Sequence, residues 1–192
     1  MSANPIAETL AALWSPVLAI TTHHQGRDNG LIAATGVFAS LVPEAPRVLV
    51  ELAQASLTHD LVLASRVFAL HLLPATPDEA LQTSLSLVHA LGMRSGHKGD
   101  KMAGIAKRSG MTGAPILTEA LTYIEARVVG TLDGGELTIF LADVVVEGGR
   151  LRDGAPLTIS VLRERLPQEW HAEWAANRER QVRAARQRRG LR

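Results

Sequence analysis

Seven histidines are the side chains with the widest chemical range in this sequence, because imidazole can bind a metal or transfer a proton near neutral pH. His23 and His24 are adjacent, so on an extended strand they point to opposite faces and cannot easily share one ion. His71 and His89 stand among apolar residues, where a hydrogen-bonded structural histidine is the commoner case. No His-Glu-x-x-His or similar spacing is present. The histidine pattern therefore predicts no metal site.

Covalent catalysis finds little support in the sequence. The chain has no cysteine, which excludes disulfides, thiolate catalysis, iron–sulfur clusters and Cys-based zinc sites. Its small hydroxyl residues do not form a Gly-x-Ser-x-Gly nucleophile motif, and its carboxylates show no paired spacing for acid–base work. We therefore predict no catalytic side chain, and any redox chemistry must come from a bound cofactor.

Three segments together fit a planar ligand that carries a phosphate. The stretch NGLIAATGVFAS (29–40) is almost free of bulky side chains, so a strand, a helix or a flat ligand can approach its backbone closely. Ser56 and Thr58 open a predicted helix, where free amides and hydroxyls suit an anion. Lys98 and Lys101 add cations in a glycine-containing loop. Taken singly, each segment has a plainer interpretation, in which Ser56 only caps its helix and the lysines face solvent.

The elements that must position these segments are mostly strands. Alternating and β-branched residues predict strands at 16–23, 31–40, 47–52, 66–73, 120–132, 136–148 and 155–162. Helices are expected at 6–13, 56–65 and 77–92, and Asp133-Gly-Gly predicts a hairpin turn. This order differs from a regular strand–helix alternation and contains no Gly-x-Gly-x-x-Gly, which disfavours a Rossmann sheet. We expect a mainly β protein, an antiparallel barrel with peripheral helices.

Charge and hydropathy set the expected organisation and location. With 192 residues, 46% of them hydrophobic, the whole chain (1–192) is expected to form a single domain. Residues 163–192 hold nine Arg and four Glu, within a net charge of only +1 for the chain. We predict a basic helical tail there, docked on a partner subunit through Trp170 and Trp174, with nucleic-acid binding as the lesser alternative. The N-terminus lacks a signal-peptide pattern and no apolar run could cross a membrane, so a cytoplasmic location is expected.

Over residues 13–162 the sequence resembles the flavin reductase-like family of FMN-binding split barrels. SPVLAITTH…DNGLIAA is similar to the family's first hairpin, in which a strand leads to an Asn-Gly turn. ASLVPEAPRVLVEL, SLTHDLVLASRVFALHLL and GDKMAGI…GAPILTEALTYIEARV resemble its next three segments, in the same order. The order and spacing carry this resemblance, because no single motif is decisive.

The resemblance implies an antiparallel split β-barrel that forms a homodimer and binds FMN, with FAD as an alternative. It also implies that NAD(P)H stacks on the flavin and delivers hydride, so that reduced flavin can be supplied to a partner monooxygenase. The implied cofactor-binding residues are Asn29, Ala34, Thr35 and Ser40 along the ring and ribityl chain, Gln54, Ser56 and Thr58 toward the phosphate, and Lys101 as its counter-charge.

The sequence departs from the family pattern beside the Asp133-Gly-Gly turn. Many members read Gly-Asp-His there, with the His on the nicotinamide side of the flavin, but this chain reads Gly135-Glu136-Leu137. Leu137 can neither donate a hydrogen bond nor titrate. Ala34 likewise stands where many members have Ser, and Ala142-Asp143 replaces a Gly-Glu. The alternative function is therefore an FMN-binding electron-transfer or flavin-holding protein without nicotinamide activity.

Overall fold

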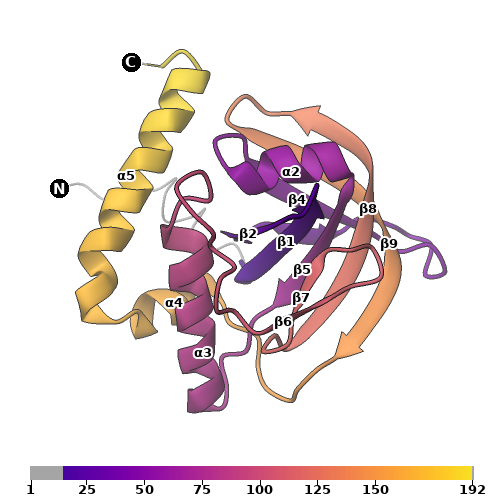
Figure 1. Ribbon diagram of the computed structural model, residues 1–192, viewed down its shortest axis with the longest axis horizontal. Coiled ribbons are helices and arrows are strands. Elements are labelled where there is room, and N and C mark those ends of the chain that lie inside the picture. Colours follow the sequence, from indigo (N-terminus) through magenta and orange to yellow (C-terminus); the bar gives the residue numbers. More distant parts are fainter. Residues whose placement is uncertain (1–14, 192) are drawn as a thin grey trace.

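The computed structural model describes residues 15–191, in which short helices interrupt a long series of strands (Figure 1). The strands are β1 (Leu18–His24), β2 (Arg27–Ala33), β3 (Gly36–Phe38), β4 (Arg47–Ala53), β5 (Val67–Leu72), β6 (Lys107–Ser109), β7 (Pro115–Leu117), β8 (Thr122–Asp133) and β9 (Leu137–Arg150). The helices are α2 (Leu57–Ser65), α3 (Asp78–Val88), the π-helix η1 (His89–Met93), α4 (Ile159–Arg165), the 3-10 helix η2 (Gln168–Trp170) and α5 (His171–Arg188). The helix predicted at 6–13 lies outside the described residues.

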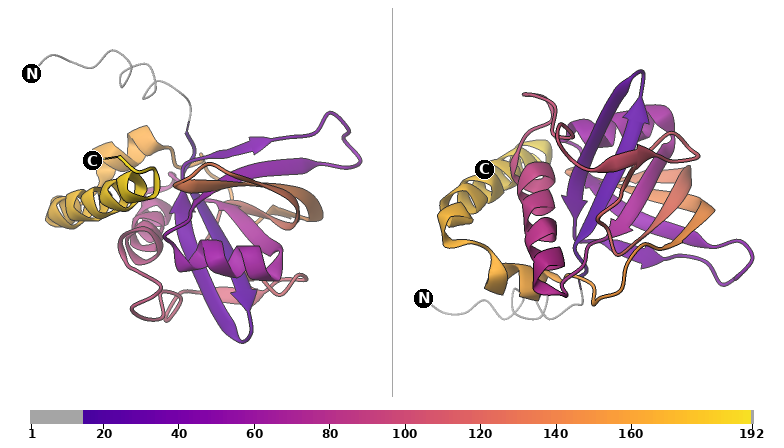
Figure 2. Two further views of the ribbon diagram at one scale, coloured as in Figure 1. Left: turned by 90° about the horizontal axis from the view of Figure 1, so that it is seen from above. Right: turned by 60° about the horizontal axis from the view of Figure 1, so that its bottom comes forward.

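One antiparallel sheet carries the fold. Its strand order is β2-β1-β5-β8-β9-β4-β3, and β6 and β7 pair separately. The register between β8 and β9 shifts at three places, and such bulges increase the local twist of a ladder. The sheet accordingly curls into a half-barrel (Figures 1 and 2). The expectation of a mainly β, antiparallel architecture with peripheral helices is confirmed.

The two faces of the sheet bury different sets of side chains. Along β1, Leu18 and Ile20 point into the curl, where they pack in a cluster that includes Phe68 and Phe140. Ala19 points the other way, into the cluster that the sheet forms with α3, η1 and α4. This alternation follows from the two-residue period of a strand. Because both faces are covered, β1 is buried over most of its length.

Helix α2 begins where the sequence predicts. The Ser56 hydroxyl accepts a hydrogen bond from the His59 amide at 3.1 Å, which satisfies one of the free N–H groups of the first turn. At its other end Arg66 adopts the left-handed conformation and its amide bonds the Val62 carbonyl. The start of α2 is thereby fixed beside the end of β4.

The position of the first turn and the extent of the second strand differ from the prediction. The first hairpin turns at Gln25-Gly26, both with positive φ (49° and 78°), and the Asn-Gly pair expected to form the turn lies on β2. A two-residue turn of this kind matches the strand twist. The strand expected at 31–40 is divided, because β2 ends at Ala33 and β3 begins at Gly36.

The segment 155–162 is also not a strand. Thr158 caps α4 by accepting a hydrogen bond from the Val161 amide at 3.3 Å. Leu162 then points into the core from this helix. The β-branched residues that suggested a strand are overridden by the cap and by the burial of one helical face.

The tail is helical, as expected, but it docks on its own chain. The Trp170 ring stacks on His89 with ring centroids 4.5 Å apart, and Trp174 packs against the cluster formed by α3, η1 and α4. The prediction that these two tryptophans reach a partner subunit is therefore corrected. The apolar surface that they cover is formed by helices of the same molecule. None of the helices within residues 15–191 has the length and apolar character to span a membrane.

Candidate functional site

A hollow of about 460 Å³ lies between one end of the sheet and helix α5. The end of β2, the end of β4, the start of α2, η1 and the loop after it form its walls. Helix α5 adds the last wall through Asn177, Arg180, Gln181 and Ala184. This volume falls in the range of about 300–1,000 Å³ found for small-molecule sites.

Small side chains form a flat wall on one side of this pocket. Ala33, Ala34 and Thr35 contribute from the end of β2, and Ala53 and Ala55 contribute from the end of β4. Because their side chains are short, a planar ligand can lie close to the backbone here. Two of the residues implied by the family resemblance, Ala34 and Thr35, thus line the pocket.

The glycines of the same stretch serve packing and do not line the pocket. A Cβ on Gly36 would lie 2.4 Å from Leu18 Cδ1, and one on Gly30 would lie 3.0 Å from the Ile20 carbonyl oxygen. Both distances are too short for a side chain to be added without movement. The bareness of residues 29–40 therefore has two causes, the close packing of the strands and an open wall.

Other residues in the lining of the pocket are polar or positively charged. Ser56 and Leu57 line it from the first turn of α2, where unpaired amides favour an anion. Ser56 accepts a bond from His59, and its hydroxyl proton can still be donated to a ligand. The same lining holds three cations, Arg94, Lys101 and Arg180, and one carboxylate, Glu51. The pocket thus combines a flat apolar wall with a site suited to phosphate.

Lys101 is nearly buried, with 6% of its surface exposed, and its ammonium group donates to the Leu91 carbonyl oxygen at 2.6 Å. Burial, together with the charge of Arg94, lowers the pKa of Lys101 from 10.5 to about 8. A bound anion would offset both effects. Lys101 is therefore a cation held ready beside the pocket without a carboxylate partner among the described side chains.

Asn29 and Thr58 support the pocket from behind. Thr58 Oγ1 donates to Asn29 Oδ1 at 3.0 Å, and both residues are buried outside the lining of the pocket. A Cβ on Gly96 would lie 2.6 Å from Asn29 Nδ2, so the loop that carries Lys101 packs directly on Asn29. This pair fixes α2, β2 and the lysine loop relative to one another.

Gln54 and Ser40 also lie outside the lining. Gln54 Nε2 donates to Asp133 Oδ1 at 2.6 Å, and its Oε1 accepts from Arg188 at 2.9 Å, so Gln54 joins the β8–β9 hairpin to the end of α5. Ser40 follows β3 and bonds Val42, at the end of the β3–β4 pair remote from the pocket. Of the eight residues implied, Ala34, Thr35, Ser56 and Lys101 meet at the pocket, and Asn29, Ser40, Gln54 and Thr58 do not line it.

Several lining residues were not anticipated as ligand contacts from the sequence. Arg94 lies in the loop after η1, and Asn177 and Arg180 lie on α5. The spacing of Asn177, Arg180 and Gln181 places them on one face of a helix, which is the only sequence signal for their role. Leu137, at the start of β9, lines the pocket as well.

His71 is a fully buried histidine away from the pocket and has a structural role, as expected. His71 Nδ1 donates to the Ala19 carbonyl oxygen at 3.0 Å, and its Nε2 accepts from the Leu117 amide at 3.1 Å. Burial lowers the pKa of His71 from 6.5 to about 4, so the ring is neutral at pH 7. No group of three His, Asp or Glu side chains in the described part of the chain could hold a metal ion.

Comparison with known proteins identifies the family of this chain. The family model described as "Flavin reductase like domain" matches residues 10–164. The ferric-chelate reductase (NAD(P)H) of Archaeoglobus fulgidus is 31% identical over 140 residues, which cover 72% of this chain and 78% of the relative. The reductase component of the 4-nitrophenol 4-monooxygenase/4-nitrocatechol 2-monooxygenase of Rhodococcus opacus is 36% identical over 131 residues, 68% of this chain and 64% of that one.

Solved structures share the fold. The structure of a nitrilotriacetate monooxygenase component B homolog from Mycobacterium thermoresistibile superposes with a TM-score of 0.66 at 25% identity, over 79% of each chain. The chain spans only 57% and 64% of the length of two of the curated relatives that it matches. The matched segment contains every strand and the pocket walls other than α5. The chain therefore belongs to the flavin reductase-like family.

Proposed function

We propose that this protein is an NAD(P)H-dependent flavin reductase that binds FMN in the pocket beneath α5. The observation that carries the proposal is the combination, in one hollow, of the flat wall of small residues and the cationic side at the start of α2. A flat tricyclic ring with a terminal phosphate requires both features. The names of the relatives, a ferric-chelate reductase (NAD(P)H) and a monooxygenase reductase component, support the reaction class.

In this proposal the flavin ring lies along Ala33, Ala34 and Thr35, and the phosphate lies at the first turn of α2. Ser56 would donate its hydroxyl proton to the phosphate, and Lys101 would supply a positive charge. Bound FMN would supply the hydride-accepting ring, which no side chain of this protein can replace. The protein's own contribution is to orient the two cofactors and to exclude water.

Helix α5 provides part of that exclusion. Its residues Asn177, Arg180, Gln181 and Ala184 close one side of the pocket, and Asn177 Nδ2 donates to the Gly92 carbonyl oxygen at 2.9 Å. Leu137 adds an apolar side chain to the wall and cannot move a proton. Hydride transfer here would thus depend on stacking and orientation rather than on general acid–base catalysis.

We also propose that two copies of the chain form a homodimer through the β3–β4 hairpin. This hairpin projects beyond the rest of the sheet (Figure 2) and leaves apolar side chains in solvent. Phe38 is 68% exposed and Leu41 is fully exposed, with Val37 and Val42 beside them at 51% each. An apolar group of this kind on one hairpin is typical of an interaction site. Light scattering of the Phe38→Ser, Leu41→Ser double variant should show a monomer where the wild type is a dimer.

A partner oxygenase would consume the reduced flavin. Support comes from two similar proteins, whose names make them components of monooxygenase systems. A second candidate function is an FMN-binding electron carrier without nicotinamide activity. It is favoured by Leu137, which lines the pocket at the position where the family resemblance leads to a histidine.

The test is anaerobic mixing of the FMN-loaded protein with NADH or NADPH, followed by the visible absorbance of the flavin. Bleaching well above the rate for free FMN is expected for a reductase. A flavin spectrum that is shifted by binding but stays oxidised would support the electron carrier instead. Protein that does not alter the FMN spectrum at all would overturn both functions.

A further inference from the structure

A second hollow, of about 490 Å³, lies beside the flavin pocket at the loop after η1. The two spaces adjoin, because they share the lining residues Met93, Arg94, Ser95, Lys101 and Arg180. Lys98, Gly99 and Asp100 complete the second one. We refer to this space as the basic hollow.

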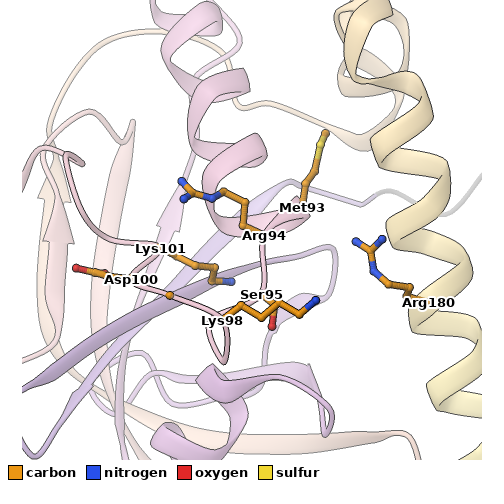
Figure 3. Close-up of a pocket in the computed structure, with 8 residues that line it drawn as sticks. Met93, Arg94, Ser95, Lys98, Asp100, Lys101 and Arg180 are labelled. Atoms are coloured by element: carbon orange, nitrogen blue, oxygen red, sulfur yellow. The ribbon is translucent and has the colours of Figure 1, made fainter.

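The charges around the basic hollow are strongly unbalanced. Four of its eight lining residues are cations, Arg94, Lys98, Lys101 and Arg180, and Asp100 is the one carboxylate. Asp100 Oδ1 accepts from the Met102 amide at 2.7 Å, and Figure 3 shows its side chain directed away from Lys98 and Arg180. None of the four cations forms an ion pair with a carboxylate among the side chains that the structure describes.

Two of the cations, Lys98 and Arg180, come from elements that are distant in the sequence. Lys98 extends from the loop toward α5, and Arg180 extends from α5 toward the loop (Figure 3). Lys101 lies between the loop and the flavin pocket, where its reduced pKa of about 8 records burial and the repulsion from Arg94. Cations that line one hollow without a carboxylate partner attract an anion into it.

Arg180 is an addition outside the family domain. The family model ends at residue 164, and α5 begins at His171. Helix α5 is held over the hollow by the 2.8 Å contact between His89 Nε2 and Glu173 Oε2 and by the bonds from Arg188 to Gln54. None of its side chains is fully buried, so these polar contacts add to the packing of the half-buried Trp174 in holding the helix in place.

We infer that the basic hollow binds the phosphates of the adenosine diphosphate half of a dinucleotide. The first turn of α2 and the basic hollow then form two anion sites in adjoining spaces, which a mononucleotide cannot fill. Two ligands share this chemistry, FAD and NAD(P)H. The inference rests on the proposed function, because it assumes that the adjoining pocket holds the flavin ring.

The test measures ligand affinity with the full-length protein, so that it does not depend on turnover. FMN, FAD and ADP are titrated by calorimetry into the wild type and the variants Arg180→Ala and Lys98→Ala. Arg183→Ala is the matched control, since Arg183 is an exposed arginine one turn further along α5 that lines neither hollow. We expect each test variant to weaken ADP binding about tenfold, because each removes one charge-assisted contact with phosphate. Lys98 does not line the flavin pocket, so Lys98→Ala should weaken FMN binding less than twofold.

The two sources are distinguished by the flavin. If FAD binds more tightly than FMN to the wild type and loses this advantage in Arg180→Ala, the adenylate of FAD occupies the hollow. If FAD and FMN bind equally, and ADP binds the FMN-loaded protein in competition with NAD⁺, the hollow serves the nicotinamide dinucleotide. Affinities for ADP, FAD and NAD⁺ that are the same in Arg180→Ala, Lys98→Ala and Arg183→Ala would overturn the inference. Failure of the proposed function is distinguishable, because then the wild type would not bind FMN.

Discussion

Asn177 on α5 donates a hydrogen bond of 2.9 Å to the carbonyl oxygen of Gly92, the fourth residue of the π-helix η1. This contact joins two segments 85 residues apart at the rim of the pocket, which both residues line. It holds the C-terminal helix over the proposed flavin site, although α5 contributes no buried side chain to the core.

Asn177→Ala is expected to speed the release of FMN about fivefold, because the loss of one neutral hydrogen bond of about 1 kcal/mol loosens the helix over the pocket. The release rate can be measured by stopped-flow fluorescence, after the FMN-loaded protein is mixed with an excess of an apoflavodoxin that captures the released FMN. The midpoint of thermal unfolding should change little. Arg178→Ala, an exposed neighbour on α5, is the control and should release FMN at the wild-type rate. An unchanged rate in Asn177→Ala would show that α5 does not limit escape.

Ser56→Asp separates helix capping from phosphate binding. Aspartate is as good an N-cap as serine, so the free energy of unfolding should stay within about 0.5 kcal/mol of the wild type. Its charge would repel the phosphate of FMN, and the Kd of FMN should rise at least about tenfold. Riboflavin, which has no phosphate, serves as the control ligand and should keep its affinity. Equal losses of affinity for FMN and riboflavin would show that the phosphate does not bind at Ser56.

Leu137→His introduces a hydrogen-bonding, titratable group on the pocket wall, where the family resemblance leads to a histidine. We expect the rate of flavin reduction by NADH to rise about tenfold and to depend on pH near the pKa of the new imidazole. Leu132→His is the matched control, since Leu132 is 63% exposed on the adjoining strand β8 and does not line the pocket. If both variants reduce flavin at the wild-type rate, the missing histidine is irrelevant to hydride transfer.

Lys101→Met is expected to stabilise the flavin-free protein while it weakens FMN binding. Below about pH 8 the lysine is charged in both the folded and unfolded states, so the cost of burying the charge is fully present. Between about pH 8 and 10.5 the folded state binds fewer protons, and the free energy of unfolding of the wild type should rise with pH. At pH 7 the variant should gain about 1 kcal/mol, after loss of the bond to Leu91 is allowed for.

Urea unfolding of wild type and Lys101→Met at pH 7 and pH 10 measures this effect, and FMN titration measures the affinity. The stability difference should be smaller at pH 10 than at pH 7. A variant that is less stable than the wild type at pH 7 would contradict the argument from burial. If the variant binds FMN with an affinity within twofold of the wild type, Lys101 does not contribute to phosphate binding.

Because burial lowers the pKa of His71, we expect the protein to lose stability in mild acid. Its pKa is about 4 in the folded state and ordinarily 6.5, so the folded state binds fewer protons between these values. The free energy of unfolding should therefore decrease as the pH falls from about 6.5 to 4, by roughly 3 kcal/mol in total. His71→Gln should be less stable at pH 7 but should show a flatter profile across this range. His24→Gln, a half-buried histidine on β1, is the control and should keep the wild-type slope.

Local sequence signals were sufficient for most of the sheet and for the start of α2. The strand predicted at 47–52 is present as β4, where buried and half-buried residues alternate after Arg47, and Asp133-Gly-Gly turns β8 into β9, as expected. Ser56 caps α2 through an atom only three residues from its partner. Such interactions act within a few residues, and therefore they can be recognised in a linear pattern.

The strand predicted at 155–162 shows where local propensity misleads. Ile159 and Val161 favour a strand by residue type, but Thr158 caps a helix and Leu162 is buried against the sheet. That burial depends on a core assembled from distant segments. The strand propensity of individual residues is weaker than the free energy gained by this burial, so a prediction from propensity alone fails here.

A bare stretch, a helix start with hydroxyls and a lysine loop could be recognised in the sequence, because each of these lies in a contiguous segment. Which of these residues line the pocket depends on the tertiary structure. Asn29 is turned inward to meet Thr58, and Gln54 is occupied by Arg188, 134 residues away. It also decided that α5 supplies Asn177 and Arg180. Contacts across such separations depend on how the whole sheet curls, which no short stretch of sequence encodes.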